Sequence, residues 1–166
     1  MVINREFFQN RSRASLELER LVLDRMEIRE EGAFAYSYLT LADFAQYDAI
    51  KVDAEPLIDV LRSIRGVCVA LILRENAPGE VRGSLRSKDD ITDVARVARV
   101  FDGGGHKAAA GFTYYGNIDQ ALDDVTRAVS CYCFADKGDD IPEAACSASV
   151  VRSLGDATSE ESVVHG

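Results

Sequence analysis

The sequence predicts an α/β fold: a small mixed or mostly antiparallel sheet of about four to five strands with helices packed on it. The clearest sign is the apolar, β-branched run at 67–73, which is typical of a central strand buried on both faces. A turn sequence at 76–79 and an alternating segment at 80–88 follow it, so the two strands should form an antiparallel hairpin. Segments with apolar residues at helical spacing flank this hairpin and should cover the sheet.

The other elements are expected where periodicity and end signals agree. Strands are expected at 33–39, 67–75, 80–88 and 111–115. Helices are expected at 15–29, from Asp53 to Gly66 and from Asn117 to Val129. A capping box at Thr40 and Asp43 predicts the start of another helix. One more is expected to begin after Asp89 or Asp90, with an apolar face that includes Ile91. The chain therefore divides into a linker remnant at 1–13, a folded domain at 14–130 and a mobile acidic tail at 131–166.

Composition and charge limit the kind of partner. A chain of 166 residues with 47% hydrophobic residues is long enough for one domain with a buried core. Its net charge of −9 argues against a general electrostatic affinity for nucleic acid. The charge is uneven, because 131–166 holds seven acidic and two basic residues, whereas 81–107 holds six basic and four acidic ones. A small basic segment on an acidic protein favours a short ligand that carries phosphate over a long duplex.

The same residues indicate a cellular setting. No apolar run reaches the length of a membrane span and no signal peptide precedes the fold, so we expect a cytoplasmic protein without a membrane partner. Cys131 and Cys133 have one residue between them, whereas zinc and redox pairs usually have two. Cys68 lies within the apolar run and is expected to be a buried thiol.

Three consecutive glycines, 103–105, stand directly before His106 and Lys107. Glycines leave the backbone N–H groups uncovered, so an anion can approach them closely. A short helix at 106–110 would point further backbone N–H groups into this loop. The alternative is that the glycines serve only as a flexible connection between a helix and a strand.

The strand expected at 80–88 carries a second set of polar residues. Arg82, Ser84, Arg86 and Lys88 alternate with small and apolar residues and therefore share one face. Cations and a hydroxyl on one face can bind phosphate oxygens, with Arg86 as a donor of two hydrogen bonds. Arg82 is expected to lie too far along the strand to take part. The alternative is a solvated sheet face whose charges are screened.

Two motifs carry a family resemblance: Gly-Gly-Gly-His-Lys-Ala-Ala-Ala-Gly-Phe at 103–112 and Val-Arg-Gly-Ser-Leu-Arg-Ser-Lys at 81–88. In this order, with a helical spacer between them, they resemble the DHHA1 domain. This domain is the C-terminal, substrate-binding half of DHH-family phosphoesterases. The likeness spans about residues 12–130 and is strongest to the branch of bifunctional oligoribonuclease/pAp phosphatases, so the expected fold is DHHA1-like.

The resemblance implies a ligand, a partner domain and a set of site residues. The ligand would be a short RNA or a nucleotide bisphosphate, and the partner an N-terminal DHH catalytic domain that holds manganese and is missing from these residues. The chain alone would then be an inactive part of a manganese-dependent phosphodiesterase or phosphatase, without catalytic or metal-binding residues of its own; a homodimer is left open. The substrate-binding residues would be Ser84, Arg86, Lys88, Gly103, Gly104, Gly105 and His106.

Two other hypotheses stay open. The chain is a stand-alone interaction or oligomerisation domain if the glycines only allow helices to pack closely. An independent hydrolase would need a metal site, and the sequence has no Asp-His-His run and only two histidines, His106 and His165. The acidic tail at 131–166 could also compete with a ligand for the basic segment.

Overall fold

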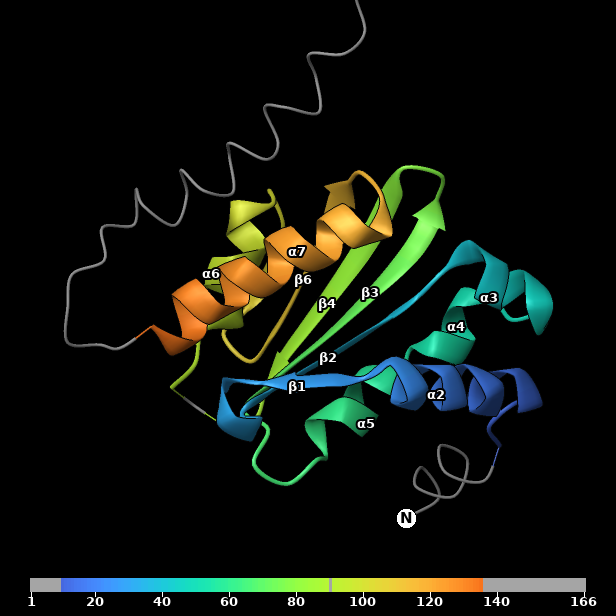
Figure 1. Cartoon of the computed structure of the whole chain (residues 1–166), viewed down its shortest axis with the longest axis horizontal. Coiled ribbons are helices and arrows are strands. Elements are labelled where there is room, and N and C mark those ends of the chain that lie inside the picture. The colour runs from blue at the N-terminus through green and yellow to red at the C-terminus, as the bar shows by residue number, and fades with distance from the viewer. Residues whose placement is uncertain (1–9, 90, 136–166) are drawn as a thin grey trace, which may run out of the picture.

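The computed structural model describes residues 10–89 and 91–135, which form a six-stranded sheet with helices on both faces (Figure 1). The strands are β1 (Glu27–Arg29), β2 (Phe34–Leu39), β3 (Val69–Ala77), β4 (Glu80–Ser87), β5 (Gly104–His106) and β6 (Ala109–Tyr115). Their order in the sheet is β1-β2-β3-β4-β6-β5, and β2 and β3 are parallel while all other neighbours are antiparallel. The predicted mixed α/β sheet is confirmed.

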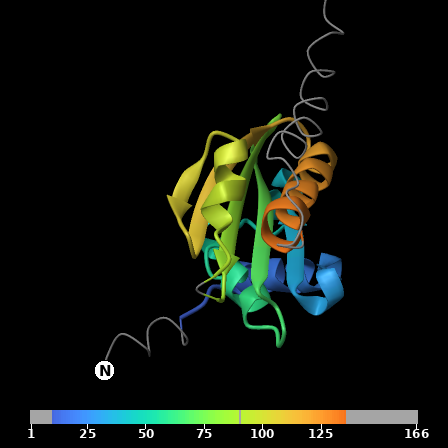
Figure 2. The same ribbon diagram turned by 90° about the vertical axis from the view of Figure 1, so that its left-hand side faces the viewer.

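The sheet has six strands and not the expected four to five, because the two edge strands were missed. β1 and β5 have three residues each, which is too short for an alternating pattern to be visible in the sequence. Figure 2 shows β5 and β6 in yellow and orange tones at one side of the sheet, away from the blue strands β1 and β2. The glycine loop therefore belongs to an edge strand of the sheet.

Within the described residues, six helices connect and cover these strands. They are α2 (Arg13–Arg25), α3 (Leu41–Gln46), α4 (Lys51–Ala54), α5 (Leu57–Arg62), α6 (Val94–Val100) and α7 (Ile118–Val129), with a 3₁₀ turn at Glu30–Gly32 and a π-helical turn at Ser130–Phe134. The capping box predicted at Thr40 and Asp43 is present at the start of α3. Asn117 and Gln120 form the same kind of reciprocal cap at the start of α7.

Two of the predicted helix starts are wrong. The carboxylate of Asp53 accepts the N–H of Ile50 within α4, and a separate helix, α5, begins after Pro56, which has no N–H to continue the first one. α6 begins after Asp93, while the carboxylate of Asp89 accepts the N–H groups of two residues in a preceding turn. Short polar side chains can cap either a turn or a helix, so sequence alone does not separate the two.

Three smaller expectations also differ from the structure. The first helix ends at Arg25 instead of residue 29, because 27–29 pairs with β2 as β1. Ile91, expected on a buried helix face, precedes α6 and is 69% exposed. Cys68 precedes β3 and is only half-buried, with its thiol 3.8 Å from the carbonyl oxygen of Gly66.

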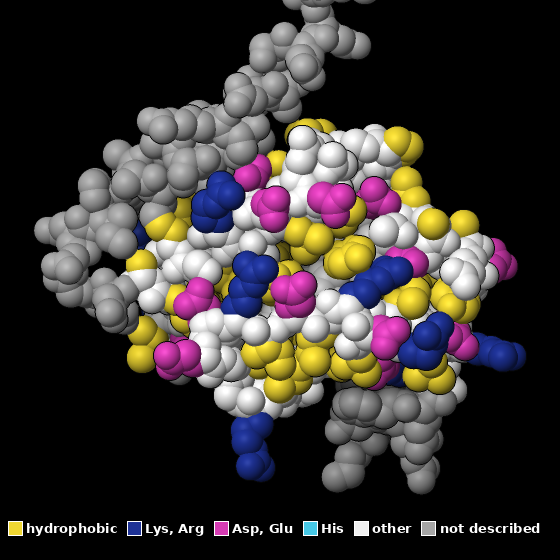
Figure 3. Space-filling view, in the orientation of Figure 1, with side chains coloured by type: hydrophobic (Ala, Val, Ile, Leu, Met, Phe, Trp, Pro, Cys, Tyr) yellow, Lys and Arg dark blue, Asp and Glu magenta, His cyan; other side chains and the backbone are white. Residues whose placement is uncertain are grey.

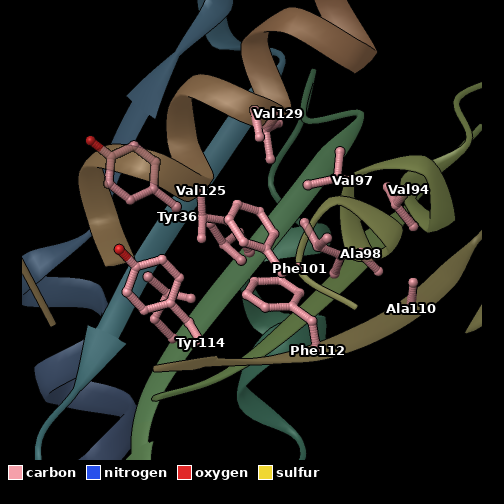
Figure 4. Packing of buried hydrophobic residues seen from close by; sticks show 14 of the residues in the cluster. Tyr36, Val94, Val97, Ala98, Phe101, Ala110, Phe112, Tyr114, Val125 and Val129 are labelled. Carbon is pink, nitrogen blue, oxygen red and sulfur yellow. The ribbon is translucent and has the colours of Figure 1, made fainter. Parts of the chain in front are cut away.

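The core consists of two apolar clusters, one on each face of the sheet. One cluster joins β2, β3, β4 and β6 to α6 and α7, and part of it is drawn in Figure 4. The second joins β2 and β3 to α2 and α5. The alternation of β3 sets Leu71 in the first cluster and Ile72 in the second, so the prediction of a strand buried on both faces is confirmed.

Gly83 shows how closely β4 and β6 pack in the first cluster. It pairs in register with Phe112, and a Cβ on Gly83 would lie 2.1 Å from the tip of the Phe112 ring. The absent side chain lets this ring lie flat on β4 and contact the ring of Phe101, with 5.0 Å between the ring centroids. Gly83 is therefore a packing residue.

The folded part extends beyond the expected domain limits at both ends. Tyr132, Cys133 and Phe134 pack against the first cluster, past the expected end at 130. The hydroxyl of Ser12 caps α2 by accepting the N–H of Ser15, inside the expected linker. The rest of the expected linker and tail, 1–9 and 136–166, lies outside the described residues. No helix within the described ranges has the length and apolar character to cross a membrane.

A buried ion pair ties α2 to α3. The guanidinium of Arg25 makes two bonds to the carboxylate of Asp43, with N–O distances of 2.5 and 2.9 Å. Burial raises the pKa of Asp43, but the bonds from Arg25 and from the Thr40 N–H lower it by more, so the pKa lies below its ordinary value. The ionised carboxylate thus stabilises the fold.

We predict that Arg25→Gln lowers the free energy of unfolding at pH 7 by about 1–3 kcal/mol, because it leaves a buried carboxylate without its charged partner. A group with a depressed pKa stabilises the folded state only while it is ionised. The loss should therefore be full above pH 3.8, the ordinary pKa of Asp, and should shrink as the pH falls through the lower pKa of folded Asp43. Urea denaturation of both proteins across this pH range measures the effect.

Arg20→Gln is the matched control on the same helix. It removes exposed bonds to Glu17 and to the hydroxyl of Tyr47, and it should leave the stability nearly unchanged at every pH. Equal losses for the two variants at pH 7 would contradict the role given to the Arg25–Asp43 pair.

Candidate functional site

The two faces of the sheet are covered unequally. On one face α6 and α7 pack over β3, β4 and β6. On the other face α2 and α5 cover β2 and β3, and α5 reaches β4. No helix of the described chain lies over β5 and β6 on this second face, and Gly104 and His106 are exposed there. We call this uncovered part of β4, β6 and β5 the open face.

Strand register brings most of the predicted phosphate-binding residues to the open face. The residues in register across β4, β6 and β5 are Ser84–Gly111–Gly104 and Arg86–Ala109–His106. Paired residues project from the same side of a sheet, so Ser84, Arg86 and His106 share this face although they are distant in the sequence. Arg86 and His106 are two strand spacings apart, about 10 Å.

A cavity of about 320 Å³ opens on this face beside α5. Its lining residues are Ala54, Glu55, Ile58, Ile72, Arg74, Arg82, Ser84 and Arg86. Ser84 and Arg86 were predicted site residues. Arg82 was expected to lie too far along the strand, but it lines the same cavity. Its Nη1 lies 3.4 Å from the hydroxyl of Thr113 on the neighbouring strand β6.

Arg74 on β3 is a cavity residue that was not expected. It is the first charged residue after the apolar run, and the hairpin register sets it directly opposite Arg82. These two facts together are the sequence signal that could have identified it. Its side chain is half-buried, and its Nη1 lies 3.5 Å from the carbonyl oxygen of Lys51.

Among the described residues, the arginines of the cavity have no acidic partner in contact. Each of the seven ion pairs in the described part of the chain involves other arginines, and none includes Arg74, Arg82 or Arg86. Arg86 donates instead to the carbonyl oxygen of Leu85, at 2.9 Å. Among the described residues, Glu55 is the single acid that lines the cavity. The cavity therefore concentrates positive charge on a protein whose net charge is −9.

The opposite face has a different character. Figure 3 shows the side that carries α7, where acidic and basic side chains are interspersed and no histidine comes into view. Ion pairs such as Arg127 with Asp124, 3.8 Å apart, contribute to this balance. This side thus carries mixed charge, whereas the cavity is lined by three arginines and Glu55 among the described residues.

The glycine loop begins at a standard helix end. The N–H of Asp102 donates to the carbonyl oxygen of Arg99, and the N–H of Gly103 to that of Ala98, at 3.2 and 2.9 Å. This pair of bonds is a Schellman motif, with Asp102 in the left-handed conformation at φ +56°. The Gly103 N–H, predicted as a phosphate donor, is therefore already engaged.

A hairpin follows the helix end. Gly104–His106 forms β5 and pairs antiparallel with β6 through a turn at Lys107 and Ala108. The short helix considered at 106–110 is wrong, because these residues take part in strand pairing instead. β5 is an edge strand, and an edge strand leaves alternate backbone N–H groups without a strand partner. Backbone donors for an anion would come from this edge.

The three glycines differ in what they allow. A Cβ on Gly103 would lie 2.3 Å from the carbonyl oxygen of Gly111, and one on Gly105 would lie 2.5 Å from that of Ala109. Neither position has room for a side chain. A Cβ on Gly104 would meet no atom within 4 Å. Packing therefore explains the first and third glycines but not Gly104.

Lys88 lies apart from the other predicted site residues. It follows the end of β4 and its Nζ donates to the carbonyl oxygen of Ile64, at 3.2 Å. It is exposed and is not among the residues that line the cavity. A role for Lys88 would require its side chain to leave this contact.

No metal centre is found in the described ranges. Within 10–89 and 91–135, no group of three or more His, Cys, Asp and Glu side chains is arranged to hold a metal ion. The manganese implied by the family resemblance therefore has no fitting ligand set among these residues, and no metal-dependent step is derived from them.

Comparison with known proteins gives one family match, and residues 31–130 match the model of the DHHA1 domain. An exopolyphosphatase-related protein from Bacteroides fragilis has a TM-score of 0.72 and 31% identity over 79% of this chain. The match covers 38% of that protein, so this chain spans well under half its length. Two solved structures are more distant. A pGpG-specific phosphodiesterase from Vibrio cholerae has a TM-score of 0.45 and 10% identity, and the match covers 70% of this chain and 39% of that one. The C-Ala domain of Aquifex aeolicus alanyl-tRNA synthetase has a TM-score of 0.44 and 17% identity, and the match covers 63% of this chain and 97% of that one.

We predict that Gly103→Ala lowers the free energy of unfolding by about 1–3 kcal/mol, because the new methyl group would collide with the backbone of β6. Gly104→Ala should change it by no more than about 0.5 kcal/mol, since its Cβ would project into open space. Chemical denaturation of the two variants provides the comparison. A similar loss for both would show that Gly104 is also a packing residue.

Proposed function

Because the chain belongs to the DHHA1 domain family, we propose that it binds the phosphate groups of short oligoribonucleotides or nucleotide bisphosphates on its open face. The observation that carries this proposal is the cavity beside α5, where three arginines and Ser84 face one space. Glu55 lines it too, but no carboxylate of the described residues forms an ion pair with these arginines. Guanidinium groups in such a position are suited to phosphate oxygens, which accept two parallel hydrogen bonds.

The proposed roles follow from position. Arg86 pairs with a phosphate and Ser84 donates a further hydrogen bond from the same strand. His106 donates to a phosphate oxygen from the far side of the open face. Gly104 keeps the surface between them bare, so that the ligand can approach the edge of β5.

In this proposal the chain is the substrate-holding part of a DHH-family phosphoesterase. The partner would be an N-terminal DHH domain, which would hold manganese and supply the metal chemistry of phosphoester hydrolysis. The residues described here would position the substrate and stabilise the charge on its phosphate. We propose no catalytic residue in this chain and expect it to be inactive alone. The oligoribonuclease/pAp phosphatase branch is our choice of substrate class, on the strength of the two motifs.

The glycine loop also supports a second candidate, an interaction or oligomerisation domain with a purely structural loop. Gly103 and Gly105 favour it, because packing accounts for both. It leaves the bare position of Gly104 and the unpaired arginines without a reason. A homodimer that depends on the loop, together with ligand binding that is indifferent to Arg86, would make this candidate the better one.

We predict that Arg86→Gln weakens the binding of adenosine 3′,5′-bisphosphate by about tenfold or more, because it removes a charge-assisted contact with phosphate. The measurement is calorimetry on the full chain, joined to an NMR titration of backbone amides. In the unchanged protein the changes in amide chemical shift on adding the ligand should concentrate at residues 82–86 and 104–106.

Arg127→Gln is the matched control, since it removes the same charge from α7 on the opposite face. The affinity of this variant for adenosine 3′,5′-bisphosphate should equal that of the unchanged protein. An Arg86 variant that binds as tightly as this control would overturn the proposed function.

A further inference from the structure

The sheet has an edge on each side, and β1 forms the edge opposite the glycine loop. β1 pairs with β2 along one side, and no strand of the described chain pairs with its other side. An edge strand leaves alternate backbone N–H and C=O groups available to a further strand. The sequence of β1 is Glu-Ile-Arg, and all three residues, 27–29, are exposed. This edge is therefore able to accept another strand.

The two charges of β1 make the strand complementary to itself. Charged side chains usually keep edge strands from pairing with one another. When two copies of β1 pair antiparallel about Ile28, however, Glu27 of each copy lies opposite Arg29 of the other. Opposite charges in directly opposed positions stabilise a strand pair. Within one chain these two side chains approach to 3.4 Å, and both remain more than half exposed, so each can reach a neighbouring copy.

One flank of α2 carries exposed leucines on the same side as this edge. Arg25 bonds to Asp43 of α3, and α3 contacts β3, so this flank of α2 is turned toward β3. Leu23 is two residues earlier, about 200° around the helix, and therefore lies on the opposite flank, toward β1. Leu16 lies two turns before Leu23 on the same flank. Both leucines expose about half of their surface.

Ile28 continues this apolar surface onto the sheet. It pairs in register with Ala35, which belongs to the cluster under α2, so Ile28 projects from the α2 face of the sheet. Ile28 is also about half exposed. Leu16, Leu23 and Ile28 thus form an apolar strip beside the free edge, which we call the edge strip.

We propose that a second copy of this chain docks on the edge strip, with the two β1 strands paired antiparallel around a two-fold axis at Ile28. The two sheets then form one continuous sheet. The axis is perpendicular to the sheet, so both α2 helices and both open faces lie on the same side of it. The contact is at the far edge from β5 and leaves the arginine cavity free, so this inference goes beyond the proposed function and does not depend on it.

The spacing of such a dimer fits the side chains of the edge strip. Three strand spacings separate the two β2 strands, which is about 14 Å. Helices in contact have axes about 8–10 Å apart. The space between the two α2 helices, above the paired strands, is therefore suited to Leu16, Leu23 and Ile28 of both copies. A strand of three residues and one helix flank make a small contact, so we expect a reversible dimer.

Sedimentation velocity of the full chain, from micromolar to millimolar concentration, measures this association. The unchanged protein should convert from monomer to dimer as the concentration rises. Ile28→Lys should weaken self-association about tenfold or more, because it places two like charges together on the two-fold axis. Ile91→Lys changes another exposed isoleucine, before α6 and away from the edge strip, and as the matched control it should leave the association constant unaltered.

An exchange of charges tests the pairing itself. Glu27→Arg and Arg29→Glu should each make the chain monomeric, because like charges would then lie opposite each other. An equimolar mixture of these two variants should form a heterodimer, since a strand with two arginines would face a strand with two glutamates. The double variant should associate as the unchanged protein does. Native mass spectrometry distinguishes the heterodimer from either homodimer, and circular dichroism checks that each variant is folded.

Three results would overturn the proposed dimer. They are an unchanged protein that stays monomeric at millimolar concentration, a dimer that Ile28→Lys does not weaken, and a mixture of the charge variants that stays monomeric. A dimer that survives Ile28→Lys would belong to another surface, such as the glycine loop. If Ile28→Lys does not fold, the mixture of Glu27→Arg with Arg29→Glu decides the question.

Discussion

The register of the β3–β4 hairpin is the constraint on which the rest of the site depends. Side chains alternate between the faces of a sheet, so this register sends Val81 and Leu85 into the core under α6 and α7 and leaves Ser84 and Arg86 on the other face. A slip of one residue would bury the arginines and expose the apolar residues. The two apolar clusters make such a slip costly, and they therefore hold the cationic cavity in place.

Helices cover the two faces of the sheet unequally, so part of the face that carries Ser84 and Arg86 stays open. α6 and α7 close one face, whereas α2 and α5 stop short of β6 and β5 on the other. The bidentate Arg25–Asp43 pair and the buried bond from the Ser37 hydroxyl to the Val22 carbonyl fix α2 against its neighbours. The rigid helical layer thus has an edge, and the arginine cavity lies along it.

Some glycines of the loop allow close packing between strands, and another leaves the backbone open to a ligand. Gly103 and Gly105 let β5 lie close against β6, while Gly104 remains bare on the open face. The sequence predicts one anion loop from the three glycines, because consecutive glycines give no sign of which one is enclosed. It does not predict β5, since a strand of three residues with two glycines has no recognisable propensity.

The sequence by itself determined the mixed α/β class, the start of β4, the caps of α3 and α7 and the motifs of the DHHA1 family. These features are local, and short-range rules of alternation and capping are sufficient for them. Only the tertiary structure decided that Arg74 and Arg82 share the cavity with Arg86, that Lys88 lies apart, and that Gly104 is the loop glycine with free space for a Cβ. Those facts depend on which strands pair and where helices stop, and such long-range contacts leave little trace in the pattern of neighbouring residues.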